Sequence, residues 1–106
     1  MTEIIQKFLG VVMTDKDKET RITMLQSLNE NFDIFLSEPQ NLRMLFLCPN
    51  DPDTEIRALS IKIICRLINY NSAYVVPFLK KILYELISSL NHQIISRNEV
   101  DKIQTL

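Results

Sequence analysis

The 106-residue sequence predicts an all-α fold, an α-solenoid of about two and a half antiparallel helix pairs. Three observations support this prediction. Apolar residues recur at spacings of three and four, which is typical of amphipathic helices. One block of sequence returns after 36 positions, as successive units of a helical repeat do. With 46% hydrophobic and 24% charged residues, the chain can also bury a core.

The repeat is clearest at two acidic junctions. The stretch TDKDKETRITMLQSL, which begins at Thr14, aligns with NDPDTEIRALSIKII, which begins at Asn50. Four aligned positions are identical: Asp15 with Asp51, Asp17 with Asp53, Glu19 with Glu55, and Arg21 with Arg57. We therefore expect one module over residues 1–106, made of units at about 2–36, 38–70 and 72–106, the last incomplete.

The first unit is expected to hold two helices. An amphipathic segment from Ile4 to Met13 predicts the first helix. The second has apolar positions at Ile22, Leu25, Leu28 and Phe32. Asp17 precedes this second helix and is a natural N-cap, because its carboxylate can accept from free N–H groups of the first turn.

The second unit repeats this plan. A helix is expected from Leu42 to Cys48, stopped by Pro49 and Pro52. Asp53 is then the N-cap of a second helix, whose apolar positions run from Ile56 to Ile68 and form one face.

The third unit should begin with a helix from Ala73 to Leu90. Pro77 lies in its early turns and is expected to kink it, because the proline ring removes a donor and crowds a carbonyl. A partner helix with a poorly formed apolar face is expected to follow, at Ile94, Ile95, Val100 and Ile103.

Composition argues against several classes of function. With 12 Lys and Arg against 13 Asp and Glu, the net charge is −1, so no polyanion or polycation is the expected partner. One glycine, Gly10, cannot build a phosphate-binding loop. One histidine, His92, cannot supply most metal sites or a catalytic triad. We expect no catalytic, cofactor-binding or metal-binding residues.

The cysteines and the chain's apolar stretches indicate a cytoplasmic protein. Cys48 and Cys65 lie in apolar stretches without a Cys-x-x-Cys pair, which predicts buried, reduced thiols. The N-terminal sequence has no secretory-signal pattern. The longest apolar stretches also fall far short of the ~18 residues that a membrane span needs.

The acidic junctions have a second interpretation, because alternating acids also begin a calcium loop. That loop needs glycine at its sixth position, where the sequence has Thr20 or Ile56. It needs glutamate at its twelfth, where the sequence has Gln26 or Lys62. We therefore interpret these acids as helix caps and turns.

Paired helices of this length, with an aspartate turn followed by an arginine, resemble HEAT repeats. The stretches TDKDKETR, LNENFDIFLSEPQNLRMLF, DTEIRALSIKIICRL and NSAYVVPFLKKILYEL resemble more closely one part of the N-terminal helical array of the target of rapamycin (TOR) kinases. The resemblance covers about residues 3 to 91. It implies a segment of a growth-controlling serine/threonine protein kinase whose array binds raptor-like or rictor-like scaffold subunits. The kinase motifs themselves are missing from this chain.

Several residues are candidates for structural roles or for contact with partners. Asp17, Arg21, Asp53, Arg57 and Pro77 are the structural candidates. Arg21 and Arg57 could each bond to a carboxylate of the neighbouring unit, forming a ladder, as the HEAT resemblance also implies. For the aromatic residues we expect core positions in general. Phe35 and Tyr70 lie at turns and are the candidates for partner contact.

Two functions remain open. One is a non-catalytic scaffold segment of a TOR-like kinase, and the other is a free-standing small HEAT adaptor that binds a peptide or helix. Apolar end helices favour the segment and predict self-association through those helices. Their apolar residues are Ile4, Ile5, Phe8 and Leu9 at one end and Ile94, Ile95 and Ile103 at the other.

Overall fold

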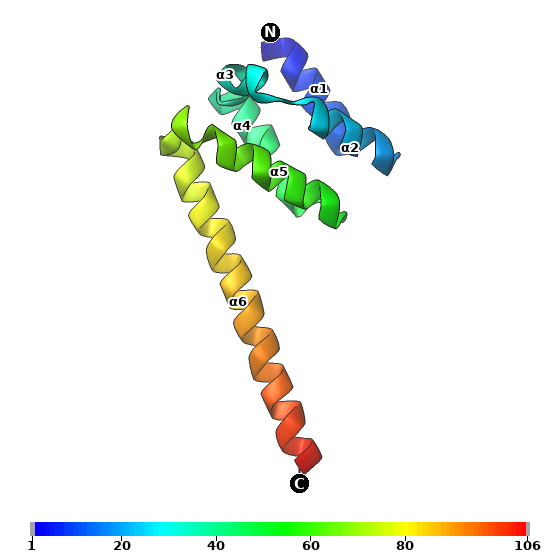
Figure 1. The fold of residues 1–106 in the computed structure, drawn as a ribbon, viewed down its shortest axis with the longest axis vertical. Helices are drawn as coiled ribbons and strands as arrows, with labels where there is room; N and C mark the ends of the chain where they lie inside the picture. The colour runs from blue at the N-terminus through cyan, green and yellow to red at the C-terminus, as the bar shows by residue number, and fades with distance from the viewer. Residues whose placement is uncertain (1, 106) are drawn as a thin grey trace. The chain divides into compact units, whose positions relative to one another are not determined.

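The computed structural model describes the backbone of residues 2–105 and the side chains of residues 3–91. Within the described backbone all regular structure is helical, with six α-helices and three short 3-10 turns (Figure 1). The all-α prediction is therefore confirmed. The chain divides into two compact parts, Met1–Val76 and Pro77–Leu106.

The first helix pair is α1, Thr2–Thr14, and α2, Lys18–Ser27. The two helices pack against each other. The second helix was expected to reach Phe32, but it ends at Ser27 and a 3-10 turn follows at Glu30–Phe32. The side-chain oxygen of Asn29 accepts from the backbone N–H of Asn31 at 2.9 Å. Asparagine offers the backbone this alternative to helical bonding, which explains the early end.

The second helix pair begins after a short helix α3, Asp33–Leu36. Helix α4 spans Pro39–Leu45, with its proline in the first turn, where no N–H partner is needed. A 3-10 turn at Cys48–Asn50, which contains Pro49, lies between α4 and the junction that follows. The first helix of this unit is as long as the expected helix from Leu42 to Cys48, but it begins and ends three residues earlier.

The repeat is visible in where the helices begin. Helix α5 spans Thr54–Arg66 and is followed by a 3-10 turn at Leu67–Asn69. Its first residue lies 36 positions after Lys18, the first residue of α2. This spacing equals that of the aligned acidic junctions.

The helices of residues 1–76 form two layers. Helix α1 contacts α4, so the first helices of the two pairs lie side by side. Helix α2 contacts α5, so the second helices do the same. Stacking of like helices is the arrangement that a helical repeat predicts, because each pair buries its apolar face against the next.

The core between these layers is aliphatic. Leu9, Leu25, Leu42, Leu45 and Ile64 are each at most 1% exposed. The expectation that aromatic residues fill the core is wrong for the described residues. The five phenylalanines are only half-buried, and Tyr70, Tyr74 and Tyr84 are 53%, 48% and 71% exposed.

Helix α6 spans Ser72–Thr105 without interruption. The turn expected between Leu90 and Ile94 is therefore absent, because no glycine or proline occurs there to end the helix. Pro77 lies inside α6, and the kink expected at this residue stays a prediction. The side chains of His92, Ile94, Ile95, Val100 and Ile103 lie outside the described residues. The division into three units also stays a prediction.

Candidate interaction surface

The two acidic junctions adopt the same local turn. At the first, the Asp15 carboxylate accepts from the backbone N–H of Asp17 at 2.7 Å. At the second, the Asp51 carboxylate accepts from the N–H of Asp53 at 2.9 Å. An aspartate that bonds two residues onward stabilises such a turn, so the repeated acids set up the start of each second helix.

The predicted cap is present at Asp53 and absent at Asp17. The Asp53 carboxylate accepts from the backbone N–H groups of Glu55 at 2.9 Å and Ile56 at 3.2 Å. Asp17 occupies the N-cap position of α2 but makes no side-chain bond to the backbone there. Its carboxylate instead accepts from the Thr20 hydroxyl at 2.6 Å, and this bond lowers the pKa of Asp17. The hydroxyl has no equivalent in the second copy, where Ile56 occupies this position.

Lys18 and Asp53 connect the two second helices. The Lys18 ammonium lies 3.0 Å from the Asp53 carboxylate. Their hydrogen bond raises the pKa of Lys18 and lowers that of Asp53. The stabilising effect of Asp53 is therefore present above its unfolded-state pKa and is lost as the pH falls through its folded-state pKa. Because the lysine is 51% exposed, the pair contributes little to stability at neutral pH.

Arg21 makes the cross-unit contact that the ladder hypothesis predicts. Its guanidinium Nη1 bonds to the Asp51 carboxylate of the next unit, and their side chains are only 14% and 11% exposed. Arg57 does not repeat this contact: it donates to the Asp51 carbonyl at 3.3 Å and the Thr54 hydroxyl at 3.0 Å, both in its own junction. The position 36 residues after Asp51 is Ile87, which has no carboxylate. Among the described residues the ladder therefore has one rung.

We expect Arg21→Ala to lower the free energy of unfolding by about 2 kcal/mol, because it removes a charge-assisted bond from the poorly exposed Asp51. Arg57→Ala is the matched control, at the equivalent position, and should cost less than about 1 kcal/mol. Urea denaturation followed by circular dichroism measures both. Equal losses in the two variants would contradict the cross-unit role of Arg21.

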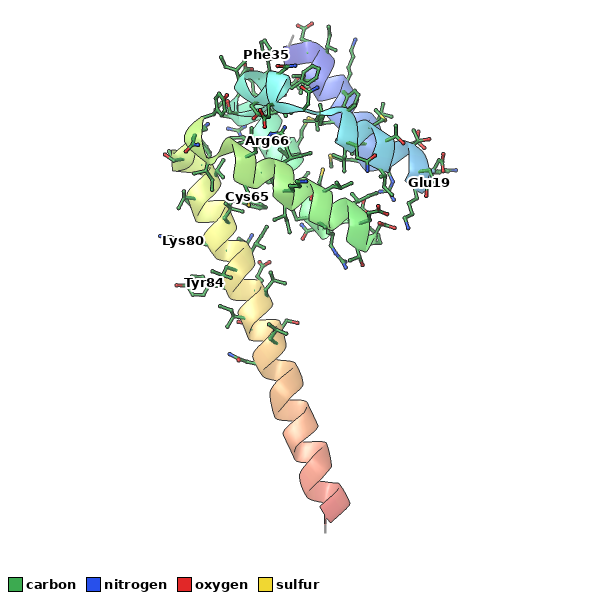
Figure 2. The ribbon with its side chains drawn as sticks, viewed as in Figure 1. Glu19, Phe35, Cys65, Arg66, Lys80 and Tyr84 are labelled. Carbon is green, nitrogen blue, oxygen red and sulfur yellow. The ribbon has the colours of Figure 1, made fainter. Side chains whose placement is uncertain are left out.

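A third cross-unit ion pair joins Asp33 and Arg66, and, like the pair of Lys18 with Asp53, it was missed by the sequence analysis. Asp33, at the start of α3, is 2% exposed. The Nε atom of Arg66 on α5 donates to both oxygens of Asp33, at 2.9 and 3.0 Å, and its Nη2 lies 2.7 Å from Oδ1 (Figure 2 labels Arg66). Nη2 also donates to the carbonyl of Leu28 at 2.8 Å. One guanidinium therefore ties the end of α5 to the connection that follows α2.

Two asparagines close the neighbouring turns and were also missed. Asn41 is fully buried, and its Nδ2 donates to the carbonyl of Phe35 at 2.7 Å. Asn71, just before α6, donates to the carbonyl of Ser37 at 2.8 Å. The sequence signal was weak, because a single asparagine near a turn usually bonds locally.

The two candidates for partner contact differ in exposure. Tyr70 follows the 3-10 turn Leu67–Asn69 and is 53% exposed, as expected for a contact residue. Phe35 lies in α3 and is half-buried (Figure 2). Their contact role stays a prediction.

A groove lies between α2 and α5, and we call it the α2–α5 groove. Its volume is about 230 Å³. It is lined by Leu25, Gln26, Leu28, Leu59, Lys62, Ile63 and Arg66. Sequence reasoning did not find it, because it depends on which faces of the two helices meet.

The two cysteines should differ in reactivity. Cys48 is buried, and burial raises the pKa of its thiol to about 11. Cys65 is exposed on α5, so the expectation that both thiols are buried is wrong for it (Figure 2). At pH 8 we expect a thiol reagent such as DTNB to modify one cysteine rapidly and the second only after denaturant is added. Cys65→Ser should abolish the rapid phase, and its persistence in that variant would contradict the assignment.

Two further observations concern metal binding and membrane insertion. Among the described residues, no three His, Cys, Asp or Glu side chains lie close enough together to hold a metal ion. No described helix is both long and apolar enough to span a membrane.

Comparison with known proteins places the sequence beside segments of much longer proteins. No family model matches the chain. Over 90 residues, 85% of this chain, it is 46% identical to serine/threonine-protein kinase TOR2 of Saccharomyces cerevisiae. Over all of its 106 residues it is 38% identical to serine/threonine-protein kinase tor1 of Schizosaccharomyces pombe and 39% identical to serine/threonine-protein kinase mTor of Drosophila melanogaster. In each case the chain spans about 4% of the relative's length.

Proposed function

This chain is homologous to one segment of the TOR serine/threonine-protein kinases, and on that basis we propose that it is a non-catalytic scaffold segment of such a kinase. The observation that carries the proposal is the alignment of all 106 residues with about 4% of each of two kinases. A match of this kind supports a chain that corresponds to a small part of a much longer protein. The sequence has no Gly-rich phosphate loop, His-Arg-Asp loop or Asp-Phe-Gly motif, so catalysis would belong to other parts of the kinase.

The mechanism of a scaffold segment is geometric. Stacked helix pairs, tied by Arg21 with Asp51 and by Arg66 with Asp33, hold one unit at a fixed rotation to the next. That rotation sets the surface presented to partners, which we propose to be neighbouring HEAT repeats and raptor-like or rictor-like subunits in the cytoplasm.

Exposed apolar side chains on α6, and to a smaller extent on α1, support packing of a further helix against each of them. In α1, Ile4 is 65% exposed, but Ile5 and Leu9 are buried and Phe8 is half-buried, so only one of the four apolar residues expected to be exposed at this end is exposed. In α6, Leu83, Leu86 and Leu90 are 57%, 55% and 57% exposed and recur at spacings of three and four. Such a stripe is typical of a helix face that packs against another helix. In the isolated chain we propose that these faces drive self-association.

Immunoblotting tests whether the chain is a segment or a free adaptor. An antibody against these 106 residues should detect, in cells of the source organism, a polypeptide about twenty-five times longer than the chain, because the chain spans about 4% of its relatives. A band at 12.4 kDa as the main product would instead support the free-standing adaptor.

A chimera tests the scaffold role itself. In yeast TOR2, the matching 90 residues would be replaced by those of this chain, to which they are 46% identical. We expect the chimera to co-purify with the scaffold subunits of TOR2 and to support growth, whereas a kinase that lacks the segment should not. A chimera that accumulates normally but recovers no subunit would contradict the proposal.

A further inference from the structure

The α2–α5 groove has an apolar floor. Leu25, Leu28 and Ile63 in this floor are 1%, 4% and 5% exposed, and Leu59 beside them is half-buried. The volume of about 230 Å³ is smaller than the cavities that usually hold drug-sized ligands or cofactors. It suits one or two aliphatic side chains of a peptide.

The rim of the groove is polar and follows the repeat. Gln26 on α2 and Lys62 on α5 are 36 positions apart, and both are exposed. Equivalent positions on stacked second helices therefore present an amide and an ammonium group along the same groove. A glutamine amide can both donate to and accept from a peptide backbone.

The charge on the groove is positive. Its lining includes Lys62 and Arg66 and no acidic residue. Arg66 is neutralised by the buried Asp33, but Lys62 makes no ion pair among the described residues. One unpaired ammonium group next to an apolar floor is complementary to a carboxylate that neighbours an aliphatic side chain.

From these observations we propose that the α2–α5 groove binds an acidic, apolar peptide segment of a partner protein. An aliphatic side chain packs on the floor formed by Leu25, Leu28 and Ile63. The peptide backbone bonds to Gln26, and a neighbouring Asp or Glu pairs with Lys62. The inference rests on the proposed scaffold function and assigns a place and a chemistry to its contacts. Nucleic acid fits less well, because it requires a stripe of cations.

Selection from a random library of 12-residue peptides by mRNA display, with the complete 106-residue chain as bait, tests this chemistry. We expect enriched peptides that carry Leu, Ile or Phe next to Asp or Glu. By fluorescence anisotropy, Lys62→Glu should weaken their binding at least tenfold and Gln26→Ala severalfold. Lys80→Glu is the matched control, because it makes the same change at an exposed lysine of α6 and should leave binding unchanged.

A charge swap completes the test. A selected peptide whose acid is changed to lysine should bind Lys62→Glu better than it binds the unchanged chain, and circular dichroism would verify that each variant is folded. Enrichment of basic or neutral peptides, equal binding to Lys62→Glu, or no enrichment would overturn the groove assignment. None of these outcomes affects the immunoblot or the chimera, so failure of the inference is distinguishable from failure of the scaffold proposal.

Discussion

Replacing Asp33 by alanine should lower the free energy of unfolding by about 3 kcal/mol, because it leaves the guanidinium of Arg66 without its carboxylate in a largely desolvated contact. Loss of a buried partner is more costly than loss of an exposed pair, since the remaining charge cannot be fully rehydrated. Chemical denaturation with urea, followed by circular dichroism, measures the change.

Glu30→Ala is the control for this prediction. Glu30 is an exposed acid in the 3-10 turn that precedes α3, and its removal should change the free energy of unfolding by less than about 0.5 kcal/mol. Similar midpoints for Asp33→Ala and the unchanged chain would show that the ion pair with Arg66 does not stabilise the fold.

The second large effect is expected at Leu45 in α4. This side chain is 0% exposed between the layers, and Leu45→Ala should cost about 2–5 kcal/mol, because it removes buried methyl groups and leaves a cavity. Leu47, two residues later, is 54% exposed, so Leu47→Ala should cost less than about 1 kcal/mol. Thermal or urea unfolding of the two variants compares the same chemical change at a buried and an exposed position. A loss at Leu47 as large as at Leu45 would contradict the described burial.

The helix pairs could be predicted because their signals are local. The acids before α2 and α5 mark where both helices begin. The aligned acids are 36 positions apart, and so are Lys18 and Thr54, the first residues of the two helices. Helix ends were harder to predict. Helix α2 ends at Ser27, before the last apolar positions of the pattern, because the Asn29 side chain starts a 3-10 turn instead. The continuous α6 shows the opposite error, because a change in apolar pattern near Leu90 was interpreted as a turn although no helix-breaking residue is present.

Contacts between units could be predicted only in part. The repeat led us to expect a bond from Arg21 to a carboxylate of the next unit, but it did not identify Asp51 as the partner. The pairing of Asp33 with Arg66 has no such signal, because the two residues are 33 positions apart and meet only when the layers stack. The same reason hides the α2–α5 groove, whose lining residues come from both second helices.

Asp51 carries several bonds at once, and this should constrain how the sequence evolves. One oxygen of its side chain holds the turn before α5, the other receives Arg21, and its carbonyl receives Arg57. Adding or deleting a single amino acid beside it would break all three together. Insertions and deletions in related genes should therefore be rare beside this codon and should accumulate elsewhere.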